Sequence, residues 1–484
     1  MKLSTLSVLT ALALSTSSVN ALTLYQDPVT GQVFTKGGEG RIEMGDFVRS
    51  TEVYTEREAK QSSLETETSG PKGNGITIIN QKSPDFPLGK ETHINMKFVP
   101  EDAPDMWLKA GVRIQGSFEN IDTDYKNKKY ILSGNPSDYK ADTNFNDGYL
   151  RRVRFEIAAG FGEHSSFVMD VRNDKSTFGI DGDESGFNVG DAYVKIKKPF
   201  DTSLVNFKLY RAKIDVSRTE TVKSARTIMY DRPYVADAAA QYISLNRRAS
   251  NVQMYGDWNK KVHYQIAAGD ASNPSKIKDA TDKTASKVNS FNIEDQSFFY
   301  GGKVRFSPFD GWEETQRTET YFGEGQHFSL GASYWAIPTM KGSASDGTNP
   351  TARFDLDRKL INLEASGHYK GLFLQGEYFK FKDAVREWTP SSGQIQTGDS
   401  SGWYVTGEYV MPELHYIAPF FRYESWDRFD NEDGYDITSK VGGINWYLRG
   451  NTIKVGMLYQ EDELEENTGD ADIRKIRLTS QWFF

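Results

Sequence analysis

Residues 473–484 read Ile-Arg-Lys-Ile-Arg-Leu-Thr-Ser-Gln-Trp-Phe-Phe, and this stretch is the clearest indication of the fold. Counted back from the C-terminus, one face of an extended chain here carries Phe484, Trp482, Ser480, Leu478 and Ile476. The other face carries Phe483, Gln481, Thr479, Arg477 and Lys475. A period of two, with apolar residues on one side and charges on the other, predicts a β-strand whose two faces meet different surroundings.

The same alternation recurs in sixteen segments, and we expect each to form a strand. The segments are 106–120, 148–159, 165–172, 188–197, 204–210, 252–258, 262–269, 297–306, 326–337, 360–369, 372–381, 402–410, 417–426, 437–448, 453–460 and 473–484. Their connections alternate between tight turns, such as 370–371, and long polar stretches, such as 211–251. One connection, 307–325, is longer than this alternation predicts. An even strand number with alternating short and long connections is typical of an all-β, transmembrane antiparallel barrel of about sixteen strands.

The charged strand faces favour a barrel over a soluble β-sandwich. In a sandwich the inner faces meet in a dry core, where charges rarely point. A ring of sixteen strands can enclose water around inward charges, while lipid covers the other face and closure leaves no unpaired edge. Aromatic residues concentrate at the two membrane interfaces of such barrels. Tryptophans near strand ends are consistent with these girdles: Trp107, Trp258, Trp335, Trp403, Trp426 and Trp446.

The N-terminal part of the chain differs from the rest. Residues 1–21 combine Lys2, an apolar run and a small-residue site ending at Ala21, a pattern that predicts a signal peptide for export. Residues 22–105 contain glycine-rich and charged stretches, and we expect a periplasmic or lumenal extension before the barrel at 106–484.

Composition excludes several functional classes. The 484 residues include no cysteine, so disulfides, thiolate metal sites and catalytic thiols are excluded. The formal net charge of −9 argues against a nucleic-acid partner, which usually requires a basic surface. The six histidines are dispersed without metal-ligand spacing, and the sequence has no nucleophile elbow or phosphate-binding loop. We therefore expect neither an enzyme nor a metal site nor a cofactor.

Five motifs stand out in order along the chain: Ala110–Gln115, Tyr149–Arg154, Val189–Val194, the run from Lys208 to Tyr234, and Val441–Tyr447. Together they resemble the phosphate-selective porin O and P family of outer-membrane porins. The similarity is strongest over 106–236 and 402–484. The resemblance implies a homotrimeric, sixteen-stranded diffusion channel whose constriction is formed by infolded loops.

The resemblance also implies an anion site at the constriction. The arginines of that site in the family fall here on Arg113, Arg151, Arg152 and Arg232. The sequence departs from the family at two positions: a lysine of the site falls on Glu220, and its carboxylate falls on Gly190, next to Asp191.

Charge and strand parity add to this expectation independently. Segment 211–250 carries eight Lys and Arg against four Asp and Glu, a difference of +4, and is our candidate constriction loop. By parity Arg113, Arg152 and Arg154 face the lumen, whereas Arg151 has lipid parity and must lie at a bulge or be shielded. Guanidinium groups at a narrow point favour anions. The alternative is that the inward arginines pair with Glu156, Asp170 or Asp191 as salt bridges of the wall.

These observations predict a porin of the bacterial outer membrane that passes small hydrophilic solutes by diffusion, with preference for anions such as phosphate. The expected pore residues are Arg113, Arg151, Arg152, Arg154, Asp191 and Arg232. Its expected partners are outer-membrane lipid and lipopolysaccharide, small anions or polar solutes, and two further copies of the chain. The alternative is a secreted, soluble β-rich binding protein or carbohydrate-active enzyme.

Overall fold

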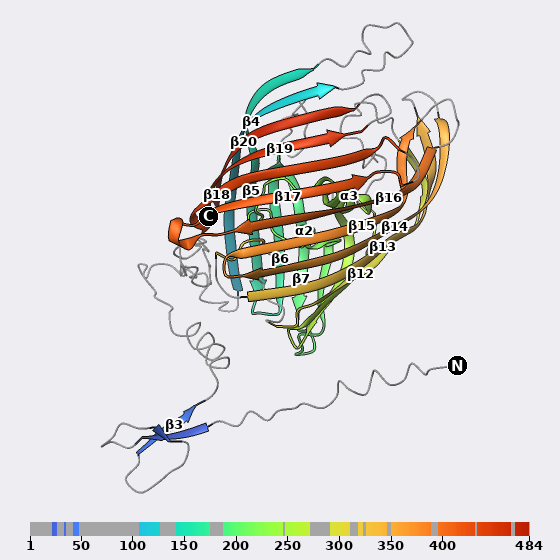
Figure 1. Ribbon diagram of the computed structural model, residues 1–484. Helices are drawn as coiled ribbons and strands as arrows, with labels where there is room; N and C mark the ends of the chain where they lie inside the picture. The colour runs from blue at the N-terminus through green and yellow to red at the C-terminus, as the bar shows by residue number, and fades with distance from the viewer. Residues whose placement is uncertain are drawn as a thin grey trace, which may run out of the picture. The chain divides into compact units, whose positions relative to one another are not determined.

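A computed structural model gives the fold of the chain (Figure 1). The structure describes residues 22–26, 33–34, 42–47, 106–125, 142–174, 187–244, 247–271, 291–309, 318–322, 326–345, 350–388, 395–430, 433–465 and 470–483. The predicted signal peptide and most of the predicted extension lie outside these residues. Residues 1–69 form a unit separate from the barrel unit, and this first unit contains an antiparallel sheet in the order β2-β1-β3. Its strands are β1 (Leu22–Gln26), β2 (Val33–Phe34) and β3 (Ile42–Phe47).

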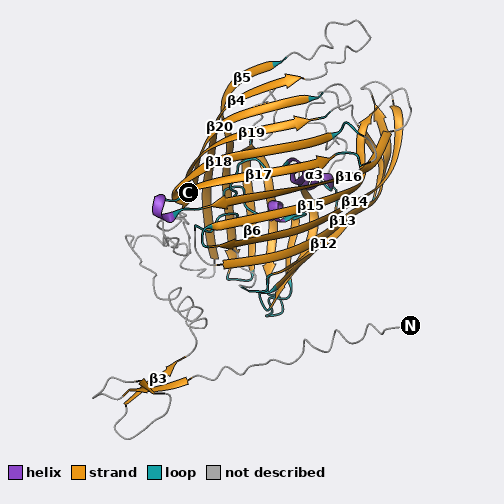
Figure 2. Cartoon of the chain, in the orientation of Figure 1, coloured by secondary structure: helices purple, strands orange, loops and turns teal. Residues whose placement is uncertain are grey.

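The second unit is a closed, antiparallel β-barrel, as the alternation predicts (Figures 1 and 2). Its strands are β4 (Met106–Tyr125), β5 (Thr143–Phe161), β6 (Ser165–Asp174), β7 (Asn188–Lys197), β8 (Asn206–Lys213), β9 (Arg248–Trp258), β10 (Val262–Gly269), β11 (Phe291–Gln296), β12 (Phe299–Phe306), β13 (Gln326–Ser345), β14 (Pro350–Tyr369), β15 (Leu372–Trp388), β16 (Ile395–Tyr409), β17 (Ile417–Asp427), β18 (Asp436–Asn451), β19 (Ile453–Leu464) and β20 (Ala471–Phe483). Because β11 and β12 both pair with β13 along its length, they share one position, and the ring has sixteen strands. The ring closes where β20 pairs with β4.

The exposed fractions of the side chains along β20 show which face of the barrel wall points outward. Its apolar residues Ile476, Leu478 and Trp482 are 46–49% exposed, while the charged residues Lys475 and Arg477 are 3% and 1% exposed. A soluble protein shows the opposite distribution. The apolar face therefore lies outside, where lipid covers it, and the charged face lies inside. This arrangement indicates a location in the bacterial outer membrane.

Many strands are longer than their alternation predicts. Only residues 346–349 connect β13 to β14, although the sequence predicts a long loop over 338–359. Strands β15 and β16 likewise extend into the expected loop 382–401. Beyond the membrane both faces of a strand meet water, so no alternation marks the strand ends in the sequence.

The prediction of aromatic girdles is wrong for two tryptophans, while three others lie on the outer surface, where a girdle residue must lie. Trp258, Trp403 and Trp446 are 42–58% exposed on the outer surface. In contrast, Trp335 and Trp426 are 0% and 2% exposed and belong to an apolar cluster inside the barrel. Parity alone could not show that part of the lumen is filled by other apolar residues.

The interior holds two short helices, α2 (Arg218–Thr221) and α3 (Tyr234–Tyr242), which Figure 2 shows within the ring of strands. A 3₁₀-helix, η5 (Pro412–Leu414), lies in the turn between β16 and β17. No helix among the described residues is long and apolar enough to span a membrane.

A charge on the outer face tests this orientation. We expect Leu478→Arg, at the centre of the outward face of β20, to lower the free energy of unfolding by about 2–4 kcal/mol, because the guanidinium would enter hydrocarbon. The measurement is urea unfolding in lipid vesicles. Leu414→Arg, in the half-exposed turn η5, is the control and should change little. Equal destabilisation by both changes would contradict the assignment of the outer face.

Candidate functional site

The connection between β8 and β9 folds into the barrel, and we call residues 214–247 the lumenal loop. It contains α2 and α3, and among its described residues Val216, Val222 and Val235 are fully buried. It lies within 211–250, the segment that the charge count singles out as the candidate constriction loop, whose ends belong to β8 and β9. Its position inside the ring requires that the wall satisfies its polar backbone groups, since water cannot reach all of them.

Helix α3 forms because its sequence is rich in alanine and because the wall caps it. Pro233 precedes the helix and offers no side-chain hydrogen bond to the first turn. The Glu424 carboxylate of β17 takes that role, accepting hydrogen bonds from the backbone N–H groups of Tyr234 (2.9 Å) and Val235 (2.6 Å). A negative charge at this helix end is favourable because the first N–H groups have no partner within the helix. The small alanine side chains allow α3 to pack on inward aromatic residues of the wall, including Trp335 and Trp426.

Further wall side chains hold the rest of the lumenal loop. Glu377 accepts from the backbone N–H of Thr219 at 2.8 Å, and the Lys454 ammonium donates to the Thr227 carbonyl at 2.7 Å. Gln481 donates to the Ala225 carbonyl at 2.8 Å. These anchors come from β15, β19 and β20, so hydrogen bonds join this part of the wall to the lumenal loop.

Arg151 lies at a β-bulge, as its parity requires. The register of β4 and β5 shifts between Gln115 and Gly116, which leaves Arg151 as the extra residue of β5. The bulge turns the side chain into the lumen, where it is 4% exposed and forms an ion pair with Asp231 of the lumenal loop. Asp231 also pairs with Arg477, which in turn pairs with Glu119 at 2.6 Å.

Asp231 is therefore a charged anchor of the lumenal loop. Burial alone would raise the pKa of its carboxyl group, but the guanidinium groups of Arg151 and Arg477 hold that pKa well below its ordinary value. The carboxylate stays ionised at any pH near neutrality.

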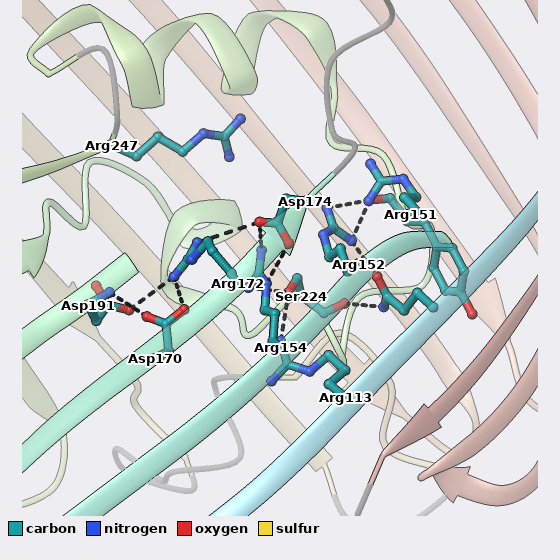
Figure 3. A network of polar contacts seen from close by, with 12 residues as sticks. Arg113, Arg151, Arg152, Arg154, Asp170, Arg172, Asp174, Asp191, Ser224 and Arg247 are labelled. Atoms are coloured by element: carbon teal, nitrogen blue, oxygen red, sulfur yellow. Dashed lines mark hydrogen bonds and ion pairs between the residues drawn. The ribbon is translucent and has the colours of Figure 1, made fainter. Parts of the chain in front are cut away.

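Arg113, Arg152 and Arg154 all face the lumen, as predicted, and Figure 3 shows them side by side. Arg113 pairs with Glu156 of the same wall, and the Arg154 Nε donates to Asp174 at 2.8 Å. Both arginines also donate to the Ser224 hydroxyl of the lumenal loop, at 3.0 and 3.2 Å. The alternative of wall salt bridges thus describes Arg113 with an expected partner, Glu156, and Arg154 with a partner that was not expected, Asp174.

Arg152 differs from its neighbours. Its guanidinium donates to the Gln115 side chain at 2.8 Å and to the Tyr230 carbonyl at 3.2 and 3.3 Å. Within the described residues it has no ion pair with a carboxylate, although it is only 4% exposed, and its buried Nε makes no hydrogen bond. The groups that bind its guanidinium directly are an amide and a backbone carbonyl, not a carboxylate.

Asp191 lies in the same network, on β7. It accepts from Arg248 at 2.7 Å, and Arg172 of β6 pairs with the adjacent Asp170 (Figure 3). A side chain at Gly190 would collide with the Arg172 guanidinium, which lies 2.1 Å from the position of a Cβ atom. The lack of a side chain at Gly190 therefore leaves space for Arg172. The next residue, Asp191, supplies the carboxylate that binds Arg248.

Arg232 forms an ion pair with a carboxylate of the lumenal loop, that of Glu220. Its Nε lies 3.2 Å from the Glu220 carboxylate, which also pairs with Lys213 (2.8 Å) and Arg247 (2.9 Å). Burial would raise the pKa of Glu220, but these three cations lower it below its ordinary value. Glu220 thus binds the cations that surround it.

Strand parity alone indicates three further lumenal residues on β6. Asp170, Arg172 and Asp174 alternate along β6 and share its lumenal face. The contacts made by Asp231 and Glu424 had no such signal, because they join the loop to strands more than 75 residues away along the chain. No cluster of three or more His, Asp or Glu residues in the described parts could hold a metal ion.

Comparison with known proteins identifies the fold. No protein-family model matches the chain. An uncharacterized protein of Aquifex aeolicus (strain VF5) is 26% identical over 428 residues, which cover 82% of this chain and 92% of that protein. The outer membrane channel DcaP of Acinetobacter baumannii superimposes with a TM-score of 0.52 at 9% identity, over 80% of this chain and 99% of that one. An anion-selective porin from Comamonas acidovorans reaches a TM-score of 0.47 at 13% identity, over 78% and 100% of the two chains. The likeness to DcaP shows that the chain has the fold of outer-membrane porins.

Removing the charge of Asp231 tests its role as an anchor. We expect Asp231→Asn to lower the free energy of unfolding by about 3–5 kcal/mol, because two buried guanidinium groups lose their shared partner. Urea unfolding in lipid vesicles measures the loss. Lys440→Ala is the matched control, because its ion pair with Glu463 is half-exposed and contributes only about 0–1 kcal/mol.

The pH dependence follows from the same anchor. Since the pKa of Asp231 is depressed, its stabilisation is fully present above the ordinary aspartate value and disappears only as the pH falls through the lowered pKa. We expect protease resistance of the lumenal loop to stay constant from pH 7 to about 4. Loss of resistance above pH 5 in the parent protein, absent in Asp231→Asn, would contradict this assignment.

Proposed function

We propose that the protein is a porin through which small hydrophilic solutes diffuse, with a preference for anions, including phosphate-like oxyanions. The fold supports a porin role. The finer part of the proposal is supported mainly by Arg152, a buried guanidinium in the lumen without a carboxylate partner among the described residues. Trimer assembly and contacts with lipopolysaccharide stay predictions.

The proposed path follows the wall of β5 to β7. On the opposite side the lumenal loop is sealed to β15, β17, β19 and β20 by the anchors described above. Along β5 to β7 the side chains retain more contact with water: Glu156 is 33% exposed and Asp191 is 23% exposed. Lys223 of the lumenal loop is also exposed. A solute passing here meets charged groups of both signs.

The preference for anions follows from the balance of these charges. Five arginines of β4 to β6 face the lumen: Arg113, Arg151, Arg152, Arg154 and Arg172. Four of them form an ion pair with a carboxylate, whereas Arg152 forms none among the described residues. A guanidinium at a narrow point lowers the barrier for anions and can bind an oxyanion through two parallel N–H groups.

Arg152→Ala removes the uncompensated charge. We expect the ratio of anion to cation permeability to fall, and inhibition of the chloride current by added phosphate to weaken. The measurement is the reversal potential in planar bilayers under a KCl gradient, followed by titration with phosphate. Lys440→Ala, at the outer end of β18, is the control and should change neither quantity. A reversal potential identical to that of the parent protein would reject the role of Arg152.

Glu156→Gln changes the balance in the opposite direction. Without its carboxylate partner, Arg113 becomes a second uncompensated cation of the wall. We expect anion preference to rise, by the same measurement of reversal potential. A shift toward cations would show that the charges of β4 and β5 do not set the selectivity.

A further inference from the structure

One connection at the turn end of the barrel enters the lumen. The other turns are short: 162–164, 198–205, 259–261, 370–371, 410–416 and 452. The exception is 307–325, which the sequence already marks as too long for its place. Its described inner part, Thr318–Phe322, is 0–8% exposed, and we call it the latch segment.

The latch segment meets the lumenal loop, which enters from the opposite end of the barrel. The backbone N–H of Glu319 donates to the Arg226 carbonyl at 2.9 Å. In return the Glu319 carboxylate accepts from the backbone N–H of Ile228 at 2.8 Å. Arg218 of α2 donates to the Thr318 carbonyl at 2.9 Å. Residues 226–229, which we call the loop tip, are thus hydrogen-bonded to the latch segment.

Apolar contacts reinforce these hydrogen bonds. The Tyr321 ring stacks on the His368 ring of β14, with centroids 3.5 Å apart, and the Phe322 ring meets that of Tyr447 edge-on at 5.1 Å. Tyr321 also shares one buried cluster with two residues of the loop tip and four of the wall: Ile228, Met229, Phe373, Phe420, Val441 and Leu458. Water is excluded from this contact.

The loop tip is therefore held from two sides. The Lys454 ammonium of β19 donates to the Thr227 carbonyl at 2.7 Å and to the Ile228 carbonyl at 3.2 Å, which fixes the tip to the wall. The latch segment covers the tip from the turn end. Without it, the apolar side chains of the tip and a buried backbone N–H would lose their partners, and ordering the tip would become less favourable.

We propose that Thr318–Phe322 is a latch that enters the lumen from the turn end, fixes the tip of the lumenal loop and keeps that half of the lumen closed to solutes. Its effect on conductance rests on the porin function proposed above. Its structural part does not, because the position of the loop tip can be measured without any transported solute.

The absence of cysteine from the sequence allows a specific test. Thr227→Cys places one thiol in the loop tip, at a residue that is 5% exposed. The full-length protein in lipid vesicles is treated with a charged, water-soluble maleimide. With the latch intact we expect slow labelling. Adding Glu319→Ala and Tyr321→Ala should accelerate labelling about tenfold, which corresponds to about 1.4 kcal/mol in the opening equilibrium of the tip.

Controls separate loosening of the latch from general unfolding. Phe309→Ala alters an exposed residue of the same connection and should leave the labelling rate unchanged. Heat-modifiable migration in gels establishes that each variant retains a folded barrel. Equal labelling rates with and without an intact latch, in folded protein, would overturn the proposal.

Conductance provides the functional arm of the test. In planar bilayers the Glu319→Ala, Tyr321→Ala variant should show a single-channel conductance about twofold or more above that of Phe309→Ala. Faster labelling with unchanged conductance rejects closure of the lumen by the latch. If the parent protein and all variants conduct nothing, the porin function fails, while the labelling result still decides whether the latch fixes the loop tip.

Discussion

In hydrocarbon a strand edge has no water to bond with, so each strand of this chain must pair on both sides. Closure meets that requirement by pairing β20 with β4, and it brings Gln481 beside Gln115, 366 residues earlier. Closure also fixes parity, because one face of every strand must then meet lipid. The charged face has only the enclosed space left, and the lumenal loop and latch segment enter that space.

The interior that results has two different halves. Toward β15 to β20, carboxylates and amides of the wall bond to the backbone of the lumenal loop, and aromatic residues such as Trp426 of β17 pack on α3. Toward β4 to β7, side-chain charges pair mainly with one another. Ion pairs therefore line one half of the interior, whereas the other half contains an apolar core that positions the loop.

Alternation made the barrel predictable, because lipid acts on every strand in the same way. It located all sixteen strand positions and required a bulge or shielding at Arg151, where the register of β4 and β5 shifts. It could not locate the partners of the arginines. The ion pair of Arg151 with Asp231 depends on the fold of the lumenal loop, and no local pattern encodes that contact. Trp426 is a different case: it shares the inward face of β17 with Arg422 and Glu424, so alternation alone places it in the lumen.

The pairing of the lumenal charges changes how selectivity should be understood. An arginine with its own carboxylate, such as Arg113 with Glu156, presents a dipole to a passing ion, and its field falls off more steeply than that of a single charge. Glu220 compensates three cations in the same way, namely Lys213 of β8 and Arg232 and Arg247 of the lumenal loop. The number of arginines is therefore a poor guide to anion preference. For the anion preference proposed here, the relevant groups are those without an ion pair, and in the described network Arg152 is such a group, oriented by Gln115 and a backbone carbonyl.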